Sequence, residues 1–327
     1  MQMRRLGRTH ERISALGFGC MGLVGWYGDR DDGEALETVH AALDAGVNHF
    51  DTAGSYQHGE NEVFLGRAIR GRRDQVFLAS SYGVARTAFG SQVLDNRPSA
   101  LRAACEESLR RLHVEVIDLF YLHRIDPKVP IEESVGALAA LNAAGKIRHL
   151  GLSNCSAAVL RRASLVHPVA AVQCEYSVWM REPEQTILPA CRELGVSLVA
   201  YAPLARGFLA GRFAALGDLP KDDIRRLQPR FQDANLALNR QIAAAFADYA
   251  QDKHCTPAQL ALAWLLAQGQ DILTIPGTKR RARLTENLGA LSVSLSSAEC
   301  EEIASRVAAL GVHGERAPRR AQQALDQ

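Results

Sequence analysis

Short apolar segments alternate along this chain with longer segments in which apolar residues recur at every third or fourth position. The short segments are almost continuously apolar, which is typical of parallel strands that are buried on both faces. The longer segments have the spacing of amphipathic helices. We therefore expect eight core strands separated by helices, with the strands at residues 16–20, 47–50, 76–80, 116–122, 147–152, 169–174, 197–201 and 272–275.

Two of the expected helices begin with a recognisable capping box. Thr256 with Gln259, and Ser296 with Glu299, have the spacing at which two side chains satisfy the free backbone N–H groups of a first helical turn. The polar, proline-containing stretch 216–235 has no such pattern. We predict that it forms a long loop, which in a compact domain usually serves a function such as that of a lid.

The alternation of strands and helices predicts an α/β protein, but periodicity alone does not separate a closed barrel from an open doubly wound sheet. Residues 17–22 have the spacing GxGxxG, yet they lie in the first strand and its exit and do not open a helix, so we reject a Rossmann motif. This favours a (β/α)8 TIM barrel with a hairpin over residues 4–14 and extra helices near its C-terminus. We expect one domain over residues 1–327, with a loosely held tail after about residue 311.

Charge and composition narrow the range of partners. The chain has 327 residues, 38 basic and 36 acidic side chains and a formal net charge of +2, a balance that does not indicate nucleic-acid or membrane binding. Its seven cysteines are scattered singly, without metal-ligand spacing, and we expect reduced core thiols. No apolar run suits a signal peptide or a membrane span, so we expect a cytoplasmic protein without a metal that acts on a small molecule. The oligomeric state is not predicted.

Residues capable of catalysis follow two of the expected strands. Asp51 and Tyr56 come directly after strand 47–50, and His123 comes directly after strand 116–122. The carboxyl ends of parallel strands meet at one edge of the sheet, where α/β proteins place their active sites. We therefore expect these three side chains to lie close together.

The sequence around Asp51 closely resembles the aldo-keto reductase superfamily. It reads FDTAxxY over residues 50–56, GxNE over residues 59–62 and LGxA over residues 65–68. The resemblance extends over nearly the whole chain. It implies a (β/α)8 barrel that binds NADP(H) and reduces a carbonyl group by direct hydride transfer.

The resemblance also implies catalytic roles. Tyr56 would protonate the developing alkoxide, and His123 would orient the carbonyl oxygen. A phenol has a pKa of about 10, so its surroundings must raise its acidity. In the family, Asp51 would pair with a lysine at the end of the third strand for this purpose.

The chain departs from the family at that lysine. The end of the third strand reads ASSYG, so Ser81 occupies the lysine position, and the five lysines of the chain all lie elsewhere. Asp51, Tyr56, Ser81 and His123 are therefore the catalytic candidates. We expect weakened catalysis, with ordered water or protonation of Asp51 compensating for the missing charge.

Motifs that resemble the cofactor site of the family follow the later strands. Their amide, hydroxyl and aromatic side chains would hold the nicotinamide, and their glycines and cations would hold the pyrophosphate and the 2′-phosphate of NADP(H). The candidates are Ser153, Asn154, Gln173, Tyr201, Leu204, Arg206, Gly207, Gly277, Thr278, Lys279, Arg283, Glu286 and Asn287.

Large side chains in the loops after the first, third and sixth strands are candidates for the substrate pocket: Trp26, Tyr27, Phe89, Trp179 and Met180. The substrate expected from the resemblance is a small carbonyl compound or the corresponding alcohol. Three functions remain open on the sequence. The chain is a reductase of aldehydes or ketones, an NADP(H)-binding regulatory protein with little chemistry, or an enzyme that uses the bound cofactor for a dehydration or epimerisation.

Overall fold

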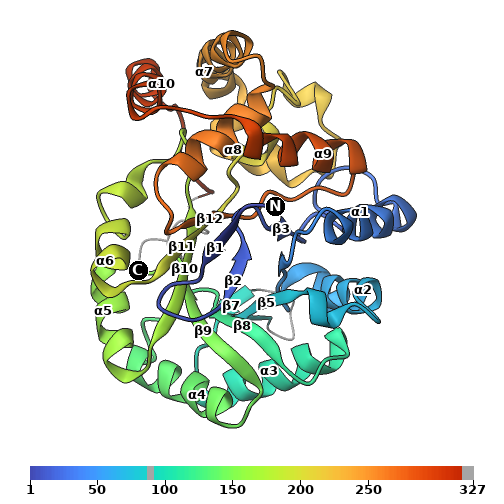
Figure 1. The fold of residues 1–327 in the computed structure, drawn as a ribbon, viewed down its shortest axis with the longest axis vertical. Helices are drawn as coiled ribbons and strands as arrows, with labels where there is room; N and C mark the ends of the chain where they lie inside the picture. Colours follow the sequence, from blue (N-terminus) through green and yellow to red (C-terminus); the bar gives the residue numbers. More distant parts are fainter. Residues whose placement is uncertain (87–91, 319–327) are drawn as a thin grey trace.

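The computed structural model describes residues 1–86 and 92–318, and its centre is a barrel of parallel strands (Figure 1). An isolated parallel bridge between Leu16 and Thr274 joins the first strand to the last, which excludes the open, doubly wound sheet. In order around the barrel the strands are β3 (Phe18–Gly19), β4 (His49–Asp51), β5 (Phe77–Tyr82), β8 (Ile117–Leu122), β9 (Ile147–Ser153), β10 (Val169–Glu175), β11 (Ser197–Tyr201) and β12 (Ile272–Thr274).

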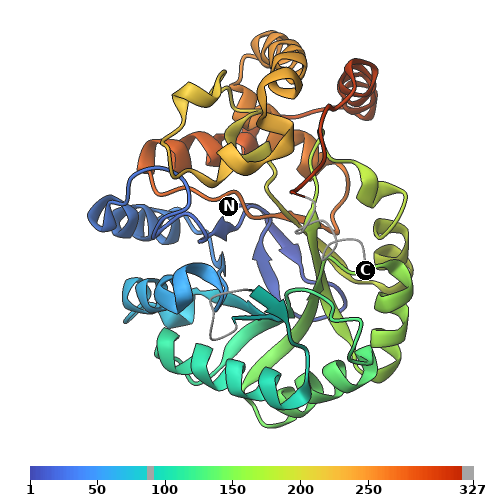
Figure 2. The same ribbon diagram turned by 180° about the vertical axis from the view of Figure 1, so that it is seen from behind.

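Helices surround the barrel and connect successive strands (Figure 2). Two further helices, α7 (Asp233–Asp252) and α10 (Ser297–Leu310), pack against each other outside this ring, as Figure 1 shows. The architecture is therefore the predicted (β/α)8 barrel with extra C-terminal helices. The helices of the ring are α1 (Asp32–Asp44), α2 (Glu60–Ala68), α3 (Pro98–Leu112), α4 (Ile131–Ala143), α5 (Ala157–Val166), α6 (Leu188–Leu194), α8 (Pro257–Ala267) and α9 (Arg281–Gly289).

An antiparallel hairpin of β1 (Met3–Arg5) and β2 (Arg12–Ser14) fills the end of the barrel at which the strands begin. Leu6 and Ile13 of this segment are fully buried among interior residues of the barrel. The guanidinium of Arg4 donates to backbone carbonyl oxygens of the segment around β12. The hairpin thus closes this end of the barrel, and a ligand can enter from the opposite end, where the strands terminate.

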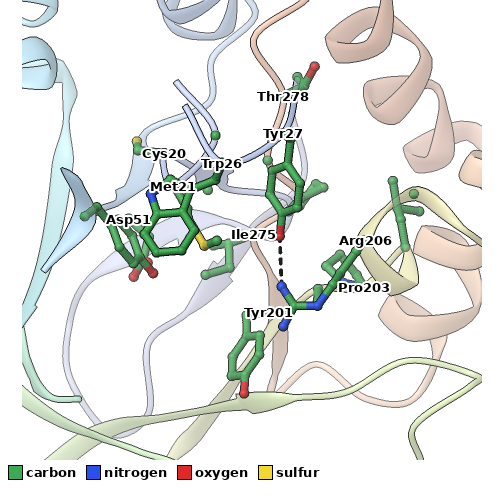
Figure 3. Close-up of a pocket in the computed structure, with 18 of the residues that line it drawn as sticks. Cys20, Met21, Trp26, Tyr27, Asp51, Tyr201, Pro203, Arg206, Ile275 and Thr278 are labelled. Carbon is green, nitrogen blue, oxygen red and sulfur yellow. Dashed lines mark hydrogen bonds between the residues drawn. The ribbon is translucent and has the colours of Figure 1, made fainter. Parts of the chain in front are cut away.

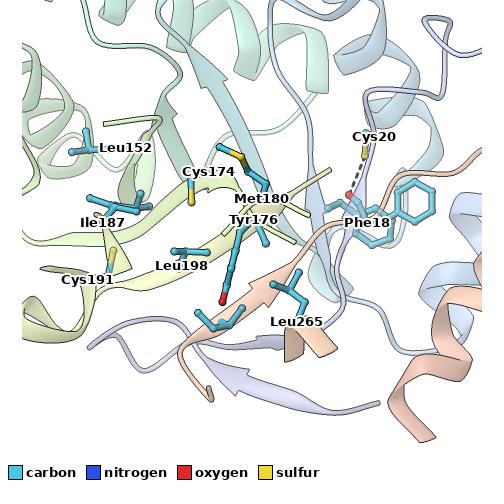
Figure 4. Packing of buried hydrophobic residues seen from close by; sticks show 14 of the residues in the cluster. Phe18, Cys20, Leu152, Cys174, Tyr176, Met180, Ile187, Cys191, Leu198 and Leu265 are labelled. Atoms are coloured by element: carbon cyan, nitrogen blue, oxygen red, sulfur yellow. Dashed lines mark hydrogen bonds between the residues drawn. The ribbon is translucent and has the colours of Figure 1, made fainter. Parts of the chain in front are cut away.

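The main core lies between the strands and the helices (Figure 4). It is built from side chains on the outer face of the strands, such as Leu152 and Leu198, and from helical residues such as Leu265. Cys174 and Cys191 also pack in this layer as small apolar side chains, and burial raises the pKa of both thiols. The cysteines described by the structure are all unpaired thiols.

Most of the expected elements are present within a few residues of their predicted ends. Both capping boxes form, and in the first of them Gln259 Oε1 accepts a hydrogen bond of 3.0 Å from the backbone N–H of Thr256. A second hairpin, β6 (Val84–Arg86) with β7 (Gln92–Leu94), was not predicted. Each of its strands has three residues, which is too short to show a strand period.

Residues 312–316, which follow α10, are better held than the sequence suggested. The backbone N–H and C=O of His313 both bond to the buried side chain of Asn239, and Arg316 forms an ion pair with Glu175 at 2.9 Å. These contacts fold residues 312–316 back over the open end of the barrel. Across the described ranges, the structure contains no helix of sufficient length and apolarity to cross a membrane.

Two helical glycines provide a matched test of this packing. A Cβ atom on Gly66 of α2 would lie 2.5 Å from the backbone oxygen of Leu112, whereas a Cβ atom on Gly136 of α4 would meet nothing within 4 Å. We expect Gly66→Ala to lower the free energy of unfolding by about 1–3 kcal/mol, because backbone has to move. Gly136→Ala is expected to raise it by about 0.5–1 kcal/mol through helix propensity. Urea unfolding of both variants measures this, and equal effects would contradict the close packing of α2 against α3.

Candidate active site

A cavity of about 400 Å³ opens at the end of the barrel where the strands terminate (Figure 3). Asp51, Tyr56 and His123 line one part of it, as the positions of their strands predicted. Thr278, Lys279 and other residues that follow β12 line another part. The cavity is therefore elongated and brings together segments from the two ends of the sequence.

Asp51 is the one acidic side chain among the described residues that line this cavity, and 4% of its surface is exposed. Its Oδ2 atom accepts a hydrogen bond of 2.8 Å from the side-chain amide of Gln173. Tyr56 and His123 stand edge to face, with their ring centroids 6.2 Å apart. The three predicted catalytic side chains thus converge, and Gln173 joins them.

Burial dominates the titration of these groups. It raises the pKa of Asp51 to about 7, against the effect of the Gln173 amide, and lowers the pKa of His123 to about 3. Burial also raises the pKa of Tyr56, and the nearby Asp51 raises it further. His123 is therefore neutral at pH 7, so one of its ring nitrogens can donate a hydrogen bond without carrying charge.

Successive side chains of β5 point to opposite faces of the strand, and this determines which of its two serines faces the site. Ala79 packs inside the barrel, so Ser81 faces the same way. Ser80 faces outward, where its hydroxyl donates a hydrogen bond of 2.6 Å to Glu62. Ser81 is buried opposite Tyr121 of β8, whose hydroxyl has no hydrogen-bond partner within the described residues. Ser81 itself does not line the cavity.

The far end of the cavity carries several cations. The lining there includes Lys279 and Arg283 together with Arg212 and Arg225. Burial lowers the pKa of Arg283, and the neighbouring Arg212 lowers it further. Arg212 is held by Glu286, whose side chain points to this arginine. Of the remaining predicted cofactor residues, those that line the cavity are Asn154, Gln173, Tyr201, Leu204, Arg206, Gly207, Gly277, Thr278 and Asn287, whereas Ser153 does not.

A segment that follows β3 crosses the cavity between its two ends. The hydroxyl of Tyr27 accepts a hydrogen bond of 2.8 Å from Arg206, and Figure 3 shows the two side chains reaching toward each other. Arg225 lies over the Tyr27 ring at 5.3 Å, and Lys279 donates to the backbone oxygen of Gly28 at 3.1 Å. The predicted long loop, which contains Arg225, therefore contributes to the wall of the site.

The expected substrate-pocket residues divide into three groups. Trp26 and Tyr27 line the cavity. Trp179 and Met180 do not, because Trp179 packs in a buried aromatic group with its ring centroid 4.8 Å from that of Phe208. Phe89 lies outside the described residues.

Sequence reasoning missed two arginines. Arg316 donates to the hydroxyl of Tyr201 at 2.7 Å and to Asn154 at 3.1 Å, in addition to its ion pair with Glu175. No local pattern in the polar tail indicated this. Arg124 lines the cavity next to His123, and its position directly after a strand-end histidine was a usable signal.

Comparison with known proteins shows to which family this chain belongs. The family model for the aldo/keto reductase family matches residues 15–308. The chain belongs to this family. It is 42% identical over 305 residues to a probable aldo-keto reductase of Glycine max, covering 93% of this chain and 88% of that protein. It is 44% identical over 306 residues to an NADP(+) aldo-keto reductase of Schizosaccharomyces pombe, covering 92% and 89%.

Solved structures agree with this family assignment. A glycerol dehydrogenase from Gluconobacter oxydans superposes with a TM-score of 0.85 at 30% identity, covering 94% of this chain and 95% of that one. The holo form of an aldo-keto reductase from Bacillus halodurans gives 0.78 at 28% identity, covering 96% and 98%. The chain is therefore an oxidoreductase of the aldo-keto reductase type.

The raised pKa of Asp51 predicts a pH-dependent stability difference. The unfolded chain ionises this carboxyl near pH 4, whereas the folded chain keeps it protonated up to about pH 7. Stability is therefore lost as the pH rises from 4 through 7, and the full penalty is present above that range. We expect Asp51→Asn to gain at least ~1 kcal/mol relative to the parent between pH 5 and pH 8.

The measurement is urea unfolding of parent and variant at both pH values without ligand. The buried His49 and His123, whose pKa values burial lowers to about 4 and about 3, are present in both proteins and cancel in the difference. A stability difference that is the same at pH 5 and pH 8 would show that Asp51 ionises normally in the folded chain.

Proposed function

We propose that this chain is an NADPH-dependent reductase of aldehydes or ketones. The observation that carries the proposal is the convergence of Asp51, Tyr56 and His123 in one cavity whose other end carries Lys279 and Arg283. Two sites with these different chemistries in one elongated cavity suit a ligand that has a phosphate-bearing end and a reactive end.

The residues at the cationic end fit an adenosine 2′-phosphate. Lys279 and Arg283 flank the start of α9, where free backbone N–H groups also favour an anion. Gly19 and Gly277 approach so closely that a Cβ atom on Gly277 would lie 2.8 Å from the backbone oxygen of Gly19. At the other end, Asn154 and other polar side chains suit a nicotinamide carboxamide.

Each catalytic side chain has one task in this proposal. Bound NADPH would supply the hydride, and the chain must supply the proton. Tyr56 donates that proton from its hydroxyl to the developing alkoxide. The neutral His123 donates a hydrogen bond to the carbonyl oxygen and holds it toward Tyr56. Asp51 lies beneath them and accepts from Gln173.

Replacement of Tyr56 tests the assignment of the acid. Tyr56→Phe removes the hydroxyl and keeps the ring against His123, so the pocket shape is preserved. We expect carbonyl reduction to fall by about 10²-fold or more, because positioned acids contribute ~10²–10⁴. NADPH binding, followed by quenching of its fluorescence, is expected to stay unchanged. Reduction of the best substrate at the parent rate would show that another residue is the acid.

The identity of residue 81 separates the reductase from a binding protein with little chemistry. We expect Ser81→Lys to raise carbonyl reduction at least tenfold and to shift the alkaline limb of the pH profile downward, because a cation favours the ionised phenol. Ser81→Met is the matched control, since it adds similar bulk without charge. If neither variant exceeds the parent across a broad panel of aldehydes and ketones while NADPH still binds, the binding protein is favoured.

A further inference from the structure

Arg124 occupies a rigid position at the open end of the barrel. It follows His123, whose backbone N–H donates to the carbonyl of Tyr82 at 2.8 Å. A Cβ atom on Gly83 would lie 3.0 Å from the backbone nitrogen of Arg124, so β5 and this turn are in close contact. Buried Asn96 accepts from the backbone N–H of Asp126 at 2.6 Å and fixes the other side of the turn. These contacts on both sides hold the backbone of Arg124 in place beside the cavity.

The guanidinium of Arg124 lacks a counter-charge among the described residues. Its Nη1 atom is buried and has no hydrogen-bond partner there, and no ion pair within the described ranges involves it. Several neighbouring arginines do have partners. Arg316 is paired with Glu175 and Arg225 with Asp223 at 2.7 Å, and Arg206 donates a hydrogen bond to the Tyr27 hydroxyl.

The surroundings of Arg124 add positive charge. Burial lowers its pKa, Tyr201 and Tyr56 oppose that effect, and the neighbouring Arg316 and Arg206 lower it further. Burial of a cation without a partner lowers the stability of the folded chain, and here the two neighbouring arginines lower it further. An anion that enters the cavity would relieve this cost, because it would form hydrogen bonds that the folded chain leaves unmade.

We propose that Arg124 binds the carboxylate of the substrate, so that the preferred substrates are aldehydes or ketones that carry a carboxyl group. This inference rests on the proposed reductase function, since Tyr56 and His123 must act on the carbonyl of the same molecule. The planar guanidinium matches a carboxylate with two parallel hydrogen bonds. Arg316 is already held by Glu175 and Arg206 by the Tyr27 hydroxyl, whereas Nη1 of Arg124 has no partner within the described residues. One such guanidinium beside His123 suits a single negative charge better than a phosphate dianion.

Pairs of substrates that differ only in this charge test the proposal. Reduction of 4-oxobutanoate is compared with that of its methyl ester, and 4-carboxybenzaldehyde with methyl 4-formylbenzoate. We expect the parent to favour the acid over the ester by at least tenfold in kcat/KM. Arg124→Met is expected to lower this ratio at least tenfold, and Arg124→Lys to retain part of it, because lysine keeps the charge without the fork. An aldehyde with a phosphate ester in place of the carboxylate is expected to show a smaller preference.

Arg162→Met is the control, because Arg162 is an exposed arginine of α5 that pairs with Glu132, and its loss changes the net charge equally. It is expected to keep the acid-to-ester ratio of the parent. If Arg124→Met slows acid and ester by the same factor, Arg124 acts on Tyr56 or on the cofactor, and the proposal is wrong. A phosphate preference larger than that for carboxylate would also overturn it.

Binding without turnover separates this inference from the proposed function. The protein with NADPH is titrated with 4-carboxybenzyl alcohol and with methyl 4-(hydroxymethyl)benzoate, neither of which NADPH can reduce. Tighter binding of the acid, lost in Arg124→Met, supports the carboxylate site even if every aldehyde is reduced slowly. Equal binding of acid and ester overturns the carboxylate site even if the chain is an efficient reductase.

Discussion

A carboxylate buried at the end of β4 is the constraint on which the site depends. Asp51 receives its hydrogen bond from the amide of Gln173 and not from a cation. Burial without a counter-charge moves its ionisation close to neutral pH. The same carboxyl raises the pKa of Tyr56. The pKa of Tyr56, the proposed acid, therefore depends on how well the barrel interior stabilises the negative charge of Asp51.

The side chains at the base of the site, near the buried Asp51, are polar but uncharged. Ser81 and Tyr121 face each other across β5 and β8 at the base of the site, and the Tyr121 hydroxyl lacks a partner within the described part of the chain. Positive charge is found instead in arginines of the cavity lining such as Arg124 and Arg206. Among the described residues no cation forms an ion pair with Asp51, which distinguishes this arrangement from one in which a lysine stands beside it.

The sequence predicted the barrel and much of the site because both depend on local signals. Strand period, helix caps and the run around Asp51 place Asp51, Tyr56 and His123 at one edge of the barrel. What sequence could not supply depends on contacts between distant segments. The ion pair of Arg316 with Glu175 joins residues 141 positions apart, and Trp179 turned into an aromatic cluster and away from the cavity. No local pattern in the sequence of the tail indicates the ion pair. A tryptophan in a loop has the same sequence signal whether it packs in an aromatic cluster or lines a cavity.

The fold-back of residues 312–316 has a consequence for how the protein is made. Glu175, Asn154 and Tyr201, all of which Arg316 contacts, leave the ribosome long before Arg316 does. The barrel can close once β12 has left the ribosome, because Thr274 can then pair with Leu16. During synthesis there is consequently an interval in which the barrel is complete but its mouth is not. A proteolytic clip after α10 would return the finished protein to that earlier state.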